Sequence, residues 1–210
     1  MPFDANAGTV SDKESLREIV GHPLPHIANK EMHAMDKHFL HYLALCPFLC
    51  ISTADAEGNQ DVSPRGDPPG FVKALDERTI LIPDRKGNRR VDTMRNILEN
   101  PKVGLILFVP GIEEVVRING SARLTDDKAL LAQCEVNGTL PNLGIVVDID
   151  DIFFHCPKAI IRSKLWDPET PIERSQFPSF GQIIHDQREE PGTVEETDAR
   201  IAKANRETLY

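Results

Sequence analysis

Residues 48–63 read FLCISTADAEGNQDVS. The first part, FLCIST, is rich in apolar and β-branched side chains and predicts a strand. The DAEGN segment that follows, with Gly58 near its end, predicts a hairpin turn, after which residues 60–63 pair back against the first strand. Pro64 comes next, and because proline cannot donate to a strand ladder, it ends the second strand or confines it to a sheet edge. The stretch therefore predicts an antiparallel sheet.

The rest of the chain continues this pattern of short strands with few helices. Further strands are predicted at residues 71–72, 79–82, 103–109, 115–124, 145–149, 152–155 and 159–162. Helices are predicted at residues 11–20, 30–45, 89–99 and 126–136, and the TVEE sequence at 193–196 is a capping box that begins a terminal helix. Such a succession predicts a mostly β chain of the α+β class, an antiparallel barrel with flanking helices.

Composition divides the chain into three parts. Residues 1–29 are rich in glycine, proline and polar side chains and are interpreted as an N-terminal arm. Residues 30–167 contain the predicted strands and form the barrel domain. After Trp166 the chain becomes polar and contains several prolines. Residues 168–210 are therefore interpreted as a C-terminal arm that packs on the body or on a second subunit.

The overall composition argues against several classes of function. The chain has 210 residues, a net charge of −9 and 6% aromatic residues, which argues against nucleic-acid binding. The longest apolar run, residues 103–110, is too short to cross a bilayer, and the first residues lack the basic and apolar regions of a signal peptide. The four cysteines lack zinc-type spacing and are predicted to be reduced thiols, without a metal site, in a cytoplasmic protein.

A concentration of cations at residues 87–90 is the first candidate binding site. The sequence GNRR follows a short apolar strand and opens the helix predicted at 89–99, with Asn88 as its N-cap. Free main-chain N–H groups, the positive end of the helix dipole and two guanidinium groups would then face one point, as they do in phosphate sites. The alternative interpretation is a solvated, basic helix start that is paired with Asp84 and Asp92.

The second candidate binding site lies at residues 61–71, which read DVSPRGDPPGF. Arg65 is followed by Gly66, where the absence of a side chain lets a ligand approach the main chain closely. Ser63 offers a hydroxyl group two residues earlier, on the same face of the strand. The alternative interpretation is a proline-stiffened turn with an ion pair between Arg65 and Asp67.

Taken together, these segments resemble the pyridoxamine 5′-phosphate oxidase-like flavoproteins, which have a split β-barrel and bind FMN. In the oxidase a Gly-Ser-Arg-Lys stretch contacts the FMN phosphate, and the resemblance implies that residues 87–90 would take that place here. The chain is more similar to a subgroup classed as FMN-dependent enzymes with an SPRGD motif, through DVSPRGD at 61–67, IPDRKGNRR at 82–90 and FHCPKA…RSKLW at 154–166. The oxidase's C-terminal arginine and histidine for substrate binding are not recognisable here, so vitamin B6 oxidation is not implied.

The resemblance implies a set of residues that would bind FMN. They are Ser63, Arg65, Asn88, Arg89, Arg90 and Arg117. The first five would hold the phosphate through charge and neutral hydrogen bonds. Arg117 would lie on the strand that passes near the flavin in relatives, where it or Lys158 would stabilise the reduced flavin anion. His155 is interpreted either as a proton donor or as a structural residue, and no catalytic residue is assigned.

The expected function is that of an FMN-dependent oxidoreductase acting on an unidentified small molecule. By the same resemblance, the protein is expected to be a homodimer. Two alternatives stay open: a flavin-binding or electron-carrying module without a substrate of its own, and a haem- or deazaflavin-binding relative on the same barrel. The fold alone does not choose among these functions.

Overall fold

The computed structural model describes residues 8–210, and the chain divides into two compact units with the boundary between Glu31 and Met32. In the first unit, α1 (Lys13–Val20) begins after Asp12, whose carboxylate accepts hydrogen bonds from main-chain N–H groups of the first turn. A second short helix, α2 (Pro25–Ala28), follows. Residues 1–7 of the expected N-terminal arm lie outside the described residues, and the boundaries expected at 29 and 167 stay predictions.

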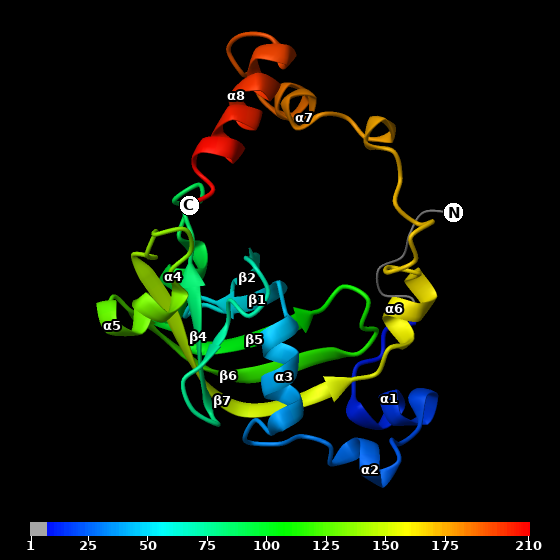
Figure 1. Ribbon diagram of the computed structural model, residues 1–210. Helices are drawn as coiled ribbons and strands as arrows, with labels where there is room; N and C mark the ends of the chain where they lie inside the picture. Colours follow the sequence, from blue (N-terminus) through cyan, green and yellow to red (C-terminus); the bar gives the residue numbers. More distant parts are fainter. Residues whose placement is uncertain (1–7) are drawn as a thin grey trace. The chain divides into compact units, whose positions relative to one another are not determined.

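The second unit is built on one seven-stranded sheet (Figure 1). Its strands are β1 (Phe48–Ala54), β2 (Gln60–Gly66), β3 (Lys73–Ala74), β4 (Thr79–Asp84), β5 (Lys102–Phe108), β6 (Val115–Thr125) and β7 (Leu143–His155). Their order across the sheet is β2-β1-β5-β6-β7-β4-β3, and every neighbouring pair is antiparallel. The predicted mostly β, antiparallel architecture with flanking helices is confirmed.

The β1–β2 hairpin has the predicted arrangement. Ala54 faces Gln60 across the turn, and Phe48 faces Gly66 at the far end of the ladder. β2 is the first strand in the sheet order, so Pro64 lies on an edge strand. Its missing N–H group therefore removes no ladder bond on the outer side.

The two ends of the sheet come together. β2 is the first strand in the order and β4 is the sixth, yet Arg65 on β2 and Asp84 at the end of β4 form an ion pair at 2.8 Å. Neighbouring strands lie about 4.8 Å apart, so a flat sheet would separate these two strands widely and only a rolled sheet brings them into contact. No strand ladder joins β2 to β4 within residues 8–210. This rolled sheet with a gap is the expected split barrel, and that prediction is confirmed.

Two helices begin later than the sequence pattern indicated. α3 (Lys37–Leu45) is capped by Asp36 and does not extend back to residue 30, because Met32 forms an isolated bridge with Ile152 of β7. α4 (Asp92–Glu99) begins three residues after the predicted start. Both helices are present and end at the predicted residues, but local chain geometry sets their N-terminal ends.

The second half of the chain contains further differences. β7 is one continuous strand where two were predicted. The predicted strand at 159–162 is wrong, because these residues belong to α6 (Lys158–Ser163), in which Ile160 is buried and Ile161 is exposed. A short apolar run does not distinguish a strand from a helix. The predicted helix at 126–136 is divided into α5 (Lys128–Leu131) and a 3₁₀ turn, η1 (Ala132–Cys134).

The C-terminal part consists of a 3₁₀ turn, η2 (Arg174–Gln176), and two helices, α7 (Phe180–Gln187) and α8 (Val194–Glu207). α8 begins with the predicted capping box: the Thr193 hydroxyl accepts from the Glu196 N–H group, and the Glu196 carboxylate accepts from the Thr193 N–H group. No helix within residues 8–210 is both long enough and apolar enough to cross a membrane.

The core lies inside the rolled sheet and under α3. Phe39 of α3 stacks on Phe154 of β7 with ring centroids 4.7 Å apart, and Tyr42 contacts the edge of the same ring. Aliphatic side chains fill the interior, and the largest fully buried ones are Leu49, Ile51, Ile80, Ile82, Leu107, Ile118, Ile145, Ile152, Val116 and Val147. Leu81 and Val146 are also fully buried, but they form a second, smaller cluster with Cys134. The core thereby holds β2 and β4 where their ends can build a site.

Candidate functional site

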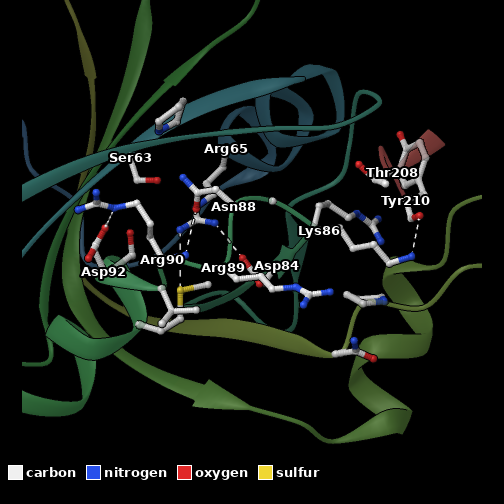
Figure 2. A pocket seen from close by; sticks show the side chains of 18 of the residues that line it. Ser63, Arg65, Asp84, Lys86, Asn88, Arg89, Arg90, Asp92, Thr208 and Tyr210 are labelled. Atoms are coloured by element: carbon white, nitrogen blue, oxygen red, sulfur yellow. Dashed lines mark hydrogen bonds and ion pairs between the residues drawn. The ribbon is translucent and has the colours of Figure 1, made fainter. Parts of the chain in front are cut away.

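A cavity of about 680 Å³ lies at the gap between β2 and β4 (Figure 2). It is lined by β2, the loop between β4 and α4, the first turn of α4, the 139–142 loop, and Thr208 and Tyr210 after α8. Its size falls within the usual range for small-molecule sites. Five of the six residues expected to bind cofactor line this one cavity, namely Ser63, Arg65, Asn88, Arg89 and Arg90.

β2 presents three polar side chains to the cavity because of its alternation. Exposure alternates along the strand, and Asp61, Ser63 and Arg65 occupy the less exposed face. Asp61 also accepts a hydrogen bond from the Thr93 hydroxyl at 3.2 Å, which ties the first turn of α4 to this strand. Within residues 8–210 the Ser63 hydroxyl has no hydrogen-bond partner, so it is available to a ligand.

The ion pairs around Arg65 differ from the alternative that the sequence suggested. Arg65 pairs with Asp84 at 2.8 Å, not with Asp67, and that interpretation is wrong. β2 ends at Gly66, so its alternation does not place the side chain of residue 67 beside Arg65. The Arg65 Nε atom is buried and has no partner within the described residues. Burial raises the pKa of Asp84 even though the nearby Arg65 charge lowers it. The attraction to Arg65 therefore offsets only part of the cost of burying the Asp84 charge.

Asp67 has a different cationic partner. Its carboxylate is 1% exposed and accepts from Arg85 Nε at 2.5 Å. Arg85 Nη2 donates to the Cys134 carbonyl at 2.6 Å, and Arg85 Nη1 is buried without a partner in the part of the chain described. The loop after β2 is thereby joined to the loop after β4.

The loop at residues 87–91 does not have the predicted helix-start geometry. Asn88 is not the N-cap of α4; its Oδ1 atom accepts from the Arg90 N–H group at 3.0 Å and closes a turn before the helix. Arg89 and Val91 both have left-handed conformations, with φ of 61° and 56°. Such a conformation is costly for a β-branched residue such as Val91 and is typical of functional sites.

The N-terminus of α4 opens into the cavity without a side-chain cap. Its N-cap residue, Val91, has no side chain that can accept a hydrogen bond, and the next residues, Asp92, Thr93 and Met94, also line the cavity. The first N–H groups of a helix have no acceptor within it, and together with the helix dipole they favour an anion. Asp92 partly offsets this potential, because its carboxylate lies in the first turn.

Positive charge exceeds negative charge around the cavity. The lining carboxylates are Asp61, Asp84 and Asp92, and the lining cations are Arg65, Arg85, Lys86, Arg89 and Arg90. In a chain of net charge −9, such a local excess of cations is an anion-binding environment. A phosphate group matches this environment better than a neutral ligand does.

Arg117 is not brought to this cavity. It lies on β6 opposite Ile106 and Phe153, and its guanidinium carbon is 5.1 Å from the centroid of the Phe153 ring. His155 and Lys158 are also absent from the cavity lining. Within residues 8–210 no group of three or more histidine, cysteine or acidic side chains is placed to hold a metal ion.

Some lining residues were not identified from the sequence. Tyr210 lies far from both motifs in the chain, and no local pattern indicated its place in the site. The same holds for Thr139, Leu140 and Asn142, which follow η1 in an irregular loop. The motif at 82–90 includes Asp84 and Arg85. Their ion pairs with residues of the motif at 61–71 depend on the rolled sheet, so no local pattern indicated them.

Three solved structures are similar to the chain: a candidate pyridoxamine 5′-phosphate oxidase of Lactobacillus delbrueckii, HupZ of Group A Streptococcus, and an FMN-binding protein of Syntrophomonas wolfei. Their sequence identities are 20%, 17% and 12%, with TM-scores of 0.46, 0.46 and 0.44. The alignments cover 59%, 57% and 68% of this chain and 98%, 94% and 96% of the three compared chains, in the same order. Similarities this distant say nothing about the ligand.

The sequence itself gives the family. No functionally curated protein matches the chain. The family model described as pyridoxamine 5′-phosphate oxidase matches residues 35–156, which is more than half of the chain and includes both motifs of the cavity. The chain therefore belongs to the pyridoxamine 5′-phosphate oxidase-like family of FMN-binding split barrels.

Proposed function

We propose that this protein is an FMN-dependent oxidoreductase that acts on a small molecule. Within the family, we assign it to the subgroup with the SPRGD motif. The main support is the meeting of two motifs that are about twenty residues apart in sequence. Ser63 and Arg65 come from β2, and residues 88–90 come from the loop after β4, yet all of them line one basic cavity at an uncapped helix N-terminus. This combination suits a ligand that carries a phosphate group.

Each of these residues would bind the phosphate through its own side-chain group. Arg89 has no polar partner within residues 8–210 and offers its guanidinium group directly, whereas Arg90 also pairs with Asp92. Asn88 uses Oδ1 within the loop, so its side-chain NH₂ group is left to donate to a phosphate oxygen. Arg65 provides a third cation and Ser63 a neutral donor. These groups fit a dianionic phosphate.

FMN, when bound, supplies the electron transfer itself, and the protein supplies binding and orientation. We assign no side chain of this site to a proton transfer. Arg65 and Arg89 would fix the phosphate end of the cofactor and thereby set the position of the ring.

We also propose that the protein is a homodimer. Apolar side chains are exposed on α3 and β1 of the described chain, including Leu40, Leu45 and Phe48. Exposed apolar groups of this kind are typical of interaction surfaces, and closed two-fold dimers are the commonest assembly. Sedimentation velocity at micromolar concentration should give twice the mass of 23.5 kDa. A monomer across that range would contradict the proposal.

A cytoplasmic location is proposed from the cysteines. The four thiols are free, and burial raises the pKa of both Cys46 and Cys134, which makes them unreactive structural thiols. Such a set is typical of a reducing compartment. A fluorescent fusion found outside the cytoplasm would contradict this location.

The function is tested in two steps. First, protein purified without added cofactor is examined by absorption spectroscopy and then titrated with FMN, with quenching of flavin fluorescence as the signal. Binding of FMN supports the proposal, whereas a haem Soret band, or a preference for a deazaflavin over FMN, would support the alternative cofactors. Second, the flavin is photoreduced anaerobically and mixed with candidate oxidants, and NAD(P)H consumption is measured. Bound FMN that exchanges electrons with no small molecule would favour the electron-carrier alternative.

A further inference from the structure

The segment at residues 208–210, which follows α8, lies against the cavity. Thr208 and Tyr210 both line it, together with the two motifs proposed to bind FMN. Figure 2 shows them at one end of the cavity, beside Lys86, with Ser63 and Asp92 toward the other end. An adjoining hollow of about 400 Å³ is also lined by Tyr210. Tyr210 therefore lines both the cavity and the adjoining hollow.

Tyr210 is held by two hydrogen bonds and one cation–π contact. Its hydroxyl donates to Asp67 Oδ1 at 2.8 Å. Its main-chain oxygen accepts from Lys86 Nζ at 2.9 Å. The guanidinium carbon of Arg85 lies over its ring, 5.6 Å from the centroid. All three partners belong to the motifs at 61–71 and 82–90, so the segment is anchored to the binding site itself.

Two of the residues that bind Tyr210 are also held by other contacts, whereas the segment itself is not packed into the core. Asp67 is buried and already paired with Arg85, and Arg85 is fixed in turn by the Cys134 carbonyl. In contrast, Leu209 is 62% exposed and contributes little to holding the segment. Docking of the 208–210 segment therefore depends mainly on Tyr210. The segment can detach from its binding site without disturbing the barrel.

We propose that the 208–210 segment is a lid on the FMN cavity, with Asp67 and Arg85 as its latch. This inference rests on the proposed function, because it concerns entry to the same site. FMN enters and leaves only while Tyr210 is detached, and the latch closes again in either state. Because the latch residues bind Tyr210 whether or not the cavity is occupied, closing slows both association and dissociation and changes the affinity little.

The test compares Tyr210→Phe and Tyr210→Ala with the full-length wild-type protein. FMN association and dissociation are followed by stopped-flow flavin fluorescence. Phenylalanine keeps the ring over Arg85 and loses only the bond to Asp67, so both rates should rise roughly tenfold, the change expected when a hydrogen bond to a charged group is lost. Alanine also loses the ring, so both rates should rise further. The matched control is Asn205→Ala, at an exposed position of α8, and it should leave both rates unchanged.

The outcomes separate the lid from the cofactor assignment. Parallel increases in both rate constants, with a dissociation constant within about threefold of wild type, support the lid. An increase in the dissociation rate alone would overturn it and would make Tyr210 a direct FMN contact. Unchanged rates in both variants would also overturn the lid. In that case, FMN binding by the wild type would still support the proposed function. Absence of FMN binding by the wild type would remove the proposed function and the lid together.

Discussion

Arg90 Nε donates to Asp92 Oδ2 at 2.7 Å, so one of the two neighbouring arginines before α4 has its own carboxylate. The hydrogen bond with Asp92 is the main reason that the pKa of Arg90 is raised. Arg89, by contrast, has no polar partner within residues 8–210, and its main chain has a left-handed conformation. The two arginines are therefore not equivalent: Arg89 offers a free cation to the cavity, and Arg90 offers one that an anion must share with Asp92.

This difference predicts unequal effects on FMN binding. Arg89→Ala should weaken FMN affinity about 10- to 100-fold, because a charge-assisted contact is lost without compensation. Arg90→Ala should weaken it less, by about three- to tenfold, since Asp92 already competes for that guanidinium group. Fluorescence titration measures both, and Arg95→Ala, at an exposed position on the same helix, is the control. Equal affinities for the Arg89 variant and the wild type would remove Arg89 from the phosphate site.

Asp84 competes with a bound anion for Arg65. Burial raises the pKa of Asp84, so the ionised carboxylate is held at a cost that its partner only partly offsets. Asp84→Asn should free the Arg65 guanidinium and tighten FMN binding by about 1 kcal/mol, or roughly fivefold. Isothermal titration calorimetry at pH 7 measures the change. Weaker binding in this variant would mean that Asp84 is needed to position Arg65.

Tyr42 should make stability sensitive to alkaline pH. Its single hydroxyl proton is shared between the main-chain oxygens of Leu107 and Glu114, and burial raises its pKa to about 12. Because the folded-state pKa lies above the usual value near 10, this contribution is complete below pH 10 and is lost as the pH rises toward 12. Tyr42→Phe should cost about 1 kcal/mol at pH 7.

Urea unfolding of wild type and Tyr42→Phe across this pH range is the measurement for Tyr42. The difference in unfolding free energy between the two proteins should shrink between pH 10 and pH 12. A difference that stays constant would show that the phenol titrates in the same way in the folded and unfolded chains.

Gly120 occupies a position where no side chain fits. It lies at the irregularity where the register of β6 against β7 shifts, and an added Cβ would overlap the main-chain oxygen of Asp148. Gly120→Ala should therefore destabilise the protein by roughly 3 kcal/mol. Gly104→Ala on β5 is the matched control, because its Cβ would meet only the Asn119 side chain, at 3.6 Å. Similar thermal unfolding of the two variants would contradict this reading of the bulge.

Much of the local structure could be predicted from the sequence because it depends on neighbours in the chain. The β1–β2 hairpin, the strand predicted at 115–124 and the capping box at Thr193 all have local causes, and all are present. The strand predicted at 159–162 failed because a four-residue apolar run fits either period. The N-cap assigned to Asn88 failed because two left-handed residues intervene before α4, and non-glycine residues rarely adopt that conformation.

The sequence by itself determined that an acidic chain would form an antiparallel barrel and would carry two cationic motifs, since composition, periodicity and turn chemistry act over short distances. Only the tertiary structure decided that these motifs share one cavity, that Arg65 pairs with Asp84 while Asp67 pairs with Arg85 and Tyr210, and that Arg117 lies elsewhere. The physical reason is the rolling of the sheet, which brings its first and sixth strands together. Ion pairs across that gap depend on strand curvature and register, which no short stretch of sequence specifies.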